Sequence, residues 1–136
     1  AALRANFQKV LFDFDQASLT SPSRSALEAN AKILMKYSQV HVLIEGHTDN
    51  YGSDEYNLAL GQRRAESVHK FLLDMGVSKG KLTLISYGKE KTVVEGGGKD
   101  GEAPNRRAEF VVVAGEDVAA SSTAQPGVNV TLQVGS

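Results

Sequence analysis

The apolar positions of this chain fall into short continuous runs and longer stretches with helical spacing. Short runs rich in β-branched and aromatic residues predict strands, and apolar residues three or four positions apart predict helices. Thr20 and Ser53 are suitable N-caps, and Gly76 is a suitable left-handed stop. The predicted elements are a strand at 10–14, a helix at 22–37, a strand at 40–45, a helix after Ser53 that ends near residue 75, and strands at 82–87 and 107–113.

This order, β-α-β-α-β-β, predicts an α+β fold in which two helices pack on one face of a small mixed sheet. The glycine-rich segment 95–105 is expected to be a loop. One domain is predicted over residues 1–113, followed by a tail at 114–136 rich in small and polar residues. Within the tail, alternating apolar residues favour an additional edge strand at 127–135.

The composition is ordinary for a globular domain: of 136 residues, 41% are hydrophobic and 23% are charged. The net charge of -1 provides no basic field for DNA or RNA, so nucleic acid is not expected as a partner. The absence of cysteine excludes disulfides and thiol catalysis. No apolar run reaches the roughly 18 residues that span a bilayer. The first residues lack the features of a signal peptide, which leaves open a cytosolic protein and a processed piece of a larger one.

The second predicted helix carries polar residues where its buried face is expected. On a helical wheel of about 100° per residue, Arg64 lies about 40° and Asn57 about 20° from Val68, the centre of the apolar stripe. Arg63 lies on the opposite, solvated side. Because a desolvated guanidinium without partners is very costly, Arg64 must be paired or hydrated.

Asp49, in the loop before this helix, is the nearest acidic candidate for that pairing. One interpretation is a structural salt bridge between Asp49 and Arg64. The other is an unfilled pair that receives a ligand with both charges, its ammonium on Asp49 and its carboxylate on the fork of Arg64. The wheel alone does not choose between these interpretations.

Four motifs in register resemble the OmpA-like C-terminal domain, over about residues 10–113. They are Phe12-Asp13-Phe14-Asp15, Glu45-Gly46-His47-Thr48-Asp49-Asn50, Tyr56-Asn57-Leu58-Ala59-Leu60-Gly61-Gln62-Arg63-Arg64-Ala65 and Asn105-Arg106-Arg107-Ala108-Glu109. The third motif is similar to the peptidoglycan-associated lipoprotein branch of that family. The segment 95–104 departs from the family pattern because it is richer in glycine and lacks a common Glu-Gly-Arg-Ala run.

The resemblance implies non-covalent binding of peptidoglycan through the meso-diaminopimelate of its peptide stem, without catalysis. It assigns the amino group of that residue to Asp49 and the carboxylate to Arg64. It also implies contacts from Asn57, Phe14 and Asp15, and a weaker one from Arg106. The expected location is the periplasm of a Gram-negative bacterium. There the domain would tether the outer membrane or an envelope protein to the cell wall, through an N-terminal anchor or barrel outside this sequence.

Three other functions have some support in the residues. A metal site would use His47 and Asp49, but no third ligand stands at a suitable spacing, so neither metal nor cofactor is expected. A cell-wall lytic enzyme would need paired carboxylates, for which Asp13 and Asp15 on one face of the first predicted strand are the candidates. A wall-anchoring domain of a MotB-like flagellar stator is the remaining alternative, and it requires a transmembrane helix upstream.

Overall fold

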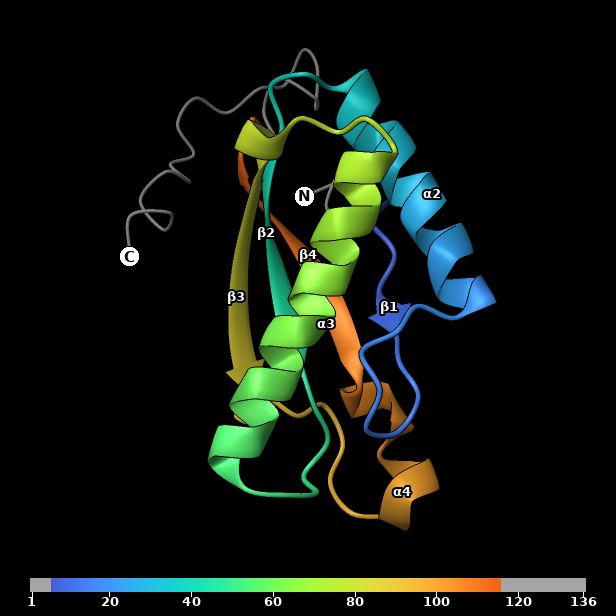
Figure 1. Ribbon diagram of the computed structural model, residues 1–136, viewed down its shortest axis with the longest axis vertical. Coiled ribbons are helices and arrows are strands. Elements are labelled where there is room, and N and C mark those ends of the chain that lie inside the picture. The colour runs from blue at the N-terminus through green and yellow to red at the C-terminus, as the bar shows by residue number, and fades with distance from the viewer. Residues whose placement is uncertain (1–5, 116–136) are drawn as a thin grey trace.

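The structure, a computed structural model, describes residues 6–115. Along the chain the elements alternate between strands and helices, and every predicted strand and helix within this range is present (Figure 1). They are β1 (Val10–Leu11), α2 (Ser21–Lys36), β2 (His41–His47), α3 (Asp54–Asp74), a 3-10 turn (Lys79–Lys81), β3 (Leu82–Gly88), α4 (Gly98–Gly101), a second 3-10 turn (Ala103–Asn105) and β4 (Arg107–Ala114).

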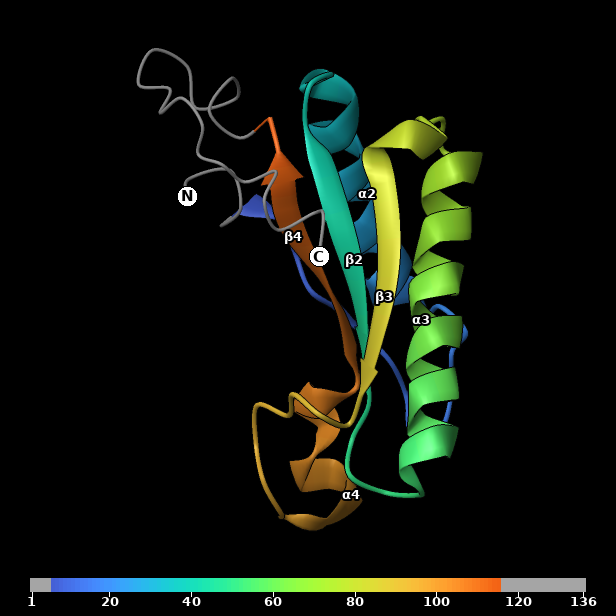
Figure 2. The same cartoon turned by 90° about the vertical axis from the view of Figure 1, so that its left-hand side faces the viewer.

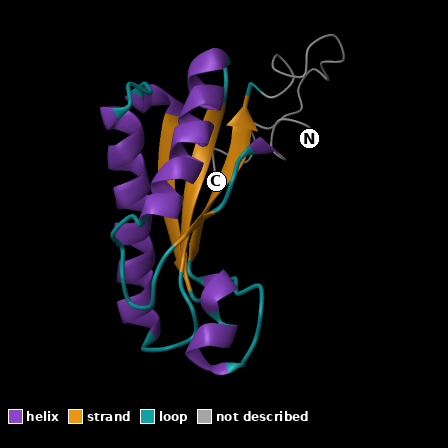
Figure 3. Ribbon diagram, turned by 90° about the vertical axis from the view of Figure 1, so that its right-hand side faces the viewer, coloured by secondary structure: helices purple, strands orange, loops and turns teal. Residues whose placement is uncertain are grey.

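The strands form one four-stranded mixed sheet in the order β1-β4-β2-β3. β2 runs parallel to β3, whereas β4 is antiparallel to both β2 and β1. Helices α2 and α3 lie on the same face of this sheet, as predicted (Figures 2 and 3). The carboxyl ends of β2 and β3 therefore meet the amino end of β4 at one edge of the sheet, where the loop before α3 and the segment carrying α4 also lie (Figure 1).

The core lies between the two helices and the sheet. Its fully buried members include Leu27, Ala31 and Leu34 of α2, Val68 and Leu72 of α3, and Val42 and Ile44 of β2. Burying these aliphatic side chains supplies the main favourable free energy of folding, at about 1.5–3 kcal/mol for each large side chain.

Both long helices begin at the predicted caps. Thr20 accepts a hydrogen bond from the backbone N–H of Ser23, with Pro22 in the first turn of α2. The Ser53 side chain caps α3 by accepting a hydrogen bond from the N–H of Tyr56. Asp54 and Glu55 in the first turn interact favourably with the positive end of the helix dipole. After α3 the chain turns at Gly76, whose φ of 104° confirms the left-handed stop.

Two segments differ from the prediction. The first strand ends at Leu11 instead of continuing to residue 14, because the chain then leaves the sheet and its carbonyls at Asp13 and Gln16 accept hydrogen bonds from α3. The glycine-rich segment contains the short helix α4, which starts from Gly97 at a φ of 87°. The predicted tail and its edge strand at 127–135 lie outside the described residues.

Two glycines set the spacing between α3 and the sheet. Gly46 on β2 and Gly61 on α3 face each other backbone to backbone, so a Cβ on Gly46 would overlap the carbonyl of Gly61. A Cβ on Gly61 would in turn overlap the hydroxyl of Ser86 on β3. Glycine is required at both positions because the backbones of the helix and the strand are in contact.

We expect Gly61→Ala to lower the free energy of unfolding by about 1–3 kcal/mol, since the helix must move away from the sheet to admit the methyl group. The matched control is Gly80→Ala, because a Cβ there would meet no atom within 4 Å. Urea denaturation of both variants measures the difference. Equal midpoints for Gly61→Ala and Gly80→Ala would contradict the close contact.

Candidate ligand-binding site

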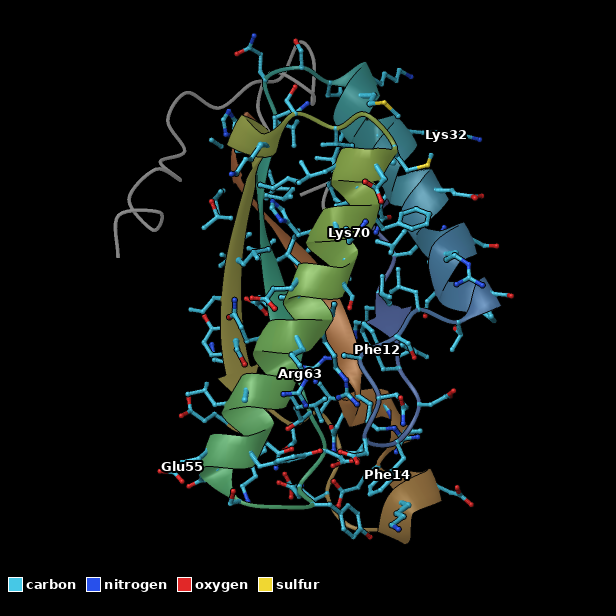
Figure 4. All side chains as sticks on the ribbon, viewed as in Figure 1. Phe12, Phe14, Lys32, Glu55, Arg63 and Lys70 are labelled. Atoms are coloured by element: carbon cyan, nitrogen blue, oxygen red, sulfur yellow. The ribbon has the colours of Figure 1, made fainter. Side chains whose placement is uncertain are left out.

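The predicted site residues come from four segments that converge at the edge of the sheet where β2 and β3 end. Phe14 and Asp15 follow β1, Asp49 follows β2, and Asn57 and Arg64 lie on α3. Arg106 directly precedes β4. Figure 4 shows Phe12 and Phe14 on the segment that passes from β1 toward α4.

Arg64 is the largest fully buried side chain among the described residues, which confirms its inward orientation. Its guanidinium donates to three backbone carbonyls: Nε to Gln16 at 2.8 Å, Nη1 to His47 at 2.9 Å and Nη2 to Asp13 at 3.1 Å. Arg64 therefore connects α3 to the end of β2 and to the segment after β1.

Arg64 and Asp49 do not form the salt bridge that was one interpretation of the sequence; carbonyl oxygens take the place of the carboxylate. Burial lowers the pKa of Arg64 to about 10, an effect that the charge of Asp49 opposes and that of Arg106 reinforces. The guanidinium thus remains protonated at neutral pH. Because Asp49, Arg106 and Asp15 all act on this pKa, these four charged groups form one electrostatic cluster.

Asp49 has one carboxylate oxygen engaged and the other without a hydrogen bond. Its side chain is only about 5% exposed, and Oδ1 accepts from the backbone N–H of Tyr51 at 3.2 Å. Oδ2 is buried and has no hydrogen-bond donor. The nearby cation is Arg106, whose Nη1 lies 3.6 Å from Oδ2, so Arg106 compensates the charge without satisfying the acceptor.

Asn57 also has one side-chain polar atom engaged and the other without a hydrogen-bond partner. It is 1% exposed, as the helical wheel predicted, and its Nδ2 donates to the carbonyls of Tyr51 and Ser53 at 2.7 and 3.1 Å. Its Oδ1 is buried and has no donor. Since buried acceptors without partners are uncommon in folded proteins, two of them near the beginning of α3 make this region a candidate ligand site.

Phe14 and Asp15 lie at the rim of the cluster. The rings of Phe14 and Tyr51 pack edge to face, with 5.7 Å between their centroids. The ammonium of Lys99 lies 4.3 Å from the centroid of the Phe14 ring. Asp15 has a positive φ of 59° and accepts a hydrogen bond from the hydroxyl of Tyr56, which raises the pKa of that tyrosine. The sequence did not single out Tyr51, Tyr56 or Lys99, because their proximity to Phe14 and Asp15 exists only in the fold.

The carboxylates proposed for a lytic enzyme are not arranged as that alternative required. Asp13 and Asp15 follow the end of β1 and do not share a strand face, because Asp15 has a left-handed backbone. Between residues 6 and 115, no three His, Asp or Glu side chains are grouped to hold a metal ion. No helix within this range has the length and hydropathy to cross a membrane.

Comparison with known proteins agrees with this architecture. A peptidoglycan-associated lipoprotein of Pseudomonas aeruginosa is 46% identical over 110 residues, which cover 81% of this chain and 64% of that protein. The crystal structure of the peptidoglycan-associated lipoprotein from Burkholderia pseudomallei is 43% identical, with a TM-score of 0.74, and the match covers 77% of this chain and 89% of that one. The C-terminal domain of Helicobacter pylori MotB has a TM-score of 0.72 at 21% identity, covers 94% of this chain and 92% of its own, and shares the fold.

The fold and the polar cluster define a small α+β domain with a candidate ligand site at the edge of its sheet. The family model described as "OmpA family" matches residues 11–107. The chain therefore belongs to the OmpA family, and the resemblance of its four motifs to that family is confirmed.

We expect Arg64→Ala to lower the free energy of unfolding by at least about 3 kcal/mol, because three carbonyls lose their donor at about 1–3 kcal/mol each. Arg63→Ala is the matched control, since this neighbouring arginine is exposed (Figure 4). Chemical denaturation of both variants at neutral pH measures the difference. A loss in Arg64→Ala no larger than that in Arg63→Ala would refute the anchoring role of Arg64.

Proposed function

We propose that this domain binds peptidoglycan non-covalently, through the meso-diaminopimelate of the peptide stem, and so tethers the outer membrane or an envelope protein to the cell wall. Membership of the OmpA family and the 46% identity to a peptidoglycan-associated lipoprotein support the binding of peptidoglycan. The proposed location is the periplasm of a Gram-negative bacterium.

The observation that carries the proposal is the buried Oδ2 of Asp49, which lacks a hydrogen-bond donor. A buried carboxylate oxygen without a donor favours an ammonium ligand, because the ammonium supplies a charge-assisted hydrogen bond that the folded chain does not make. The amino group of the diaminopimelate side chain meets this requirement, and Asn57 Oδ1 is available for a second donor of the ligand.

The ligand carboxylate is proposed to lie against Arg64 and Arg106. These two cations are close enough that the charge of Arg106 lowers the pKa of Arg64, and an anionic group between them would relieve this repulsion. Arg64 retains guanidinium hydrogens beyond the three that bind carbonyls. The pair of opposite charges therefore favours a zwitterionic group over a simple amine. Phe14 and Asp15 are proposed to contact the ligand at the rim.

The binding reaction breaks no bond and needs no cofactor. Because the charged groups are held on a helix and on loops anchored by hydrogen bonds, little conformational entropy is lost when the ligand binds. A modest affinity at one site is sufficient for tethering, since many copies engaged with one polymeric wall supply avidity.

Co-sedimentation with purified diaminopimelate-containing sacculi tests the proposal. We expect the wild type to pellet and Asp49→Asn to bind at least about tenfold more weakly, because the substitution removes the charge that receives the ammonium. Asp74→Asn, the same change at the exposed far end of α3, should bind as the wild type does. If the wild type stays in the supernatant, the binding function is wrong; if Asp49→Asn pellets fully, the site is wrong.

Sacculi that carry lysine in place of diaminopimelate test the finer assignment. Lysine keeps the side-chain amine but lacks the second carboxylate, so we expect weaker pelleting of the wild type. The loss should be smaller in Arg106→Gln, which already lacks one of the cations proposed to bind the carboxylate. Equal binding of the wild type to both kinds of sacculi would exclude recognition of that carboxylate.

A further inference from the structure

Glu102 is a buried carboxylate in the glycine-rich segment for which the proposed binding function has no direct use. It is 5% exposed and forms no salt bridge with any residue from 6 to 115. Burying a carboxylate without a cation is costly unless hydrogen bonds compensate it. Its position is therefore informative.

The compensation comes from the loop that carries Asp49. Oε1 of Glu102 accepts the backbone N–H of Asn50 at 2.8 Å and the side-chain Nδ2 of Asn50 at 3.1 Å. A third donor is Nδ2 of Asn105, at 3.3 Å. Glu102 thus connects the residue directly after Asp49 to the segment directly before Arg106.

Asn105 extends this connection into the rest of the glycine-rich segment. It is fully buried, its Oδ1 accepts from the N–H groups of Val93 and Val94, and its Nδ2 also donates to the carbonyl of Val94. Arg106 is held separately through Nη1 to the carbonyl of Lys99 and Nε to that of Phe12. These hydrogen bonds fix the segment that carries Glu102, and the hydrogen bonds from Asn50 to Glu102 attach the loop of Asp49 to it.

The contact also determines which donor is kept away from the ligand site. The backbone N–H of Asn50 is the donor next to Asp49 in sequence, and the N–H of Tyr51 already serves Asp49 Oδ1. If the N–H of Asn50 were released, the loop that carries Asp49 would lose its contact with Glu102, and the orientation of Oδ2 would no longer be fixed. Glu102 binds this N–H, so Oδ2 stays without a donor from the chain.

We infer that Glu102 is a positioning residue for ligand binding: its carboxylate holds Asn50 in the orientation that leaves Asp49 Oδ2 without a donor from the chain, so that the ammonium of the ligand supplies the missing hydrogen bond. This inference rests on the proposed function. Glu102 does not contact the ligand in this arrangement, and its effect is transmitted through Asn50 to Asp49.

The test measures the binding of a soluble diaminopimelate-containing stem peptide by calorimetry, together with hydrogen exchange of the Asn50 amide and urea unfolding. We expect Glu102→Ala to bind at least about tenfold more weakly, with faster exchange at Asn50. Glu102→Gln keeps an acceptor oxygen in place, so it should bind within about threefold of the wild type. Asp100→Asn, which removes one charge from the same segment at an exposed position, should bind as the wild type does.

The outcomes separate the two hypotheses. A wild type that does not bind the peptide refutes the proposed function itself. A wild type that binds, with a folded Glu102→Ala of equal affinity, overturns only the positioning role, and so does an equal loss in Glu102→Gln or in Asp100→Asn. If Glu102→Ala does not fold, Asn50→Ala replaces it: this variant loses one of the three donors and should bind a few-fold more weakly, and unchanged affinity would overturn the inference.

Discussion

The buried guanidinium of Arg64 is the interaction on which the arrangement of this domain depends. Three segments that are distant in sequence meet at it: the loop after β1, the end of β2, and α3, which supplies the side chain. A planar group with hydrogen-bond donors on several sides can satisfy acceptors from several directions, which an ammonium at the end of a flexible chain does less well. The same charge also interacts with that of Asp49, so one side chain serves both the fold and the proposed ligand site.

The electrostatic balance of the site follows from where its charges find partners. Arg64 is compensated mainly by carbonyl dipoles, Asp49 by a cation at 3.6 Å, and Glu102 by amide donors. Arg64 and Glu102 form no ion pair with any residue from 6 to 115, and Asp49 and Arg106 form an ion pair without a hydrogen bond to Oδ2. Close, hydrogen-bonded ion pairs within the protein would compete with the proposed zwitterionic ligand for these charges. Compensation by backbone and amide dipoles fixes the charged groups in position without such competition.

Much of the fold could be predicted from the sequence because its signals are local. Thr20 and Ser53 act as caps through their own side chains, and Gly76 ends α3 through its own backbone. The inward orientation of Asn57 and Arg64 follows from helical periodicity alone. The end of β1 at Leu11 could not be predicted, because it depends on hydrogen bonds from a helix about fifty residues away in sequence.

The partners of the site residues were equally beyond the sequence. Asp49, in the loop before α3, was the acidic partner expected for Arg64, yet the cation beside it is Arg106, brought there by the pairing of β4 with β2. Glu102 stands in a segment whose composition predicts only an irregular loop, and its burial becomes apparent only in three dimensions. Position in the sequence suggested which charged groups to consider, and strand order decided which of them meet.

The backbone contact between Gly46 and Gly61 has a consequence for how this site could diversify. Gly61 precedes Arg64 by slightly less than one helical turn. The distance between α3 and the sheet at Gly61 therefore determines where the guanidinium of Arg64 lies relative to the strands. The reach of an arginine side chain is limited, so moving α3 away from the sheet would weaken the hydrogen bond from Arg64 to the His47 carbonyl. The lack of side chains at Gly46 and Gly61 thus determines how far Arg64 extends beyond the sheet. A substitution at the rim leaves the distance between α3 and β2 unchanged, whereas a side chain at either glycine would increase it.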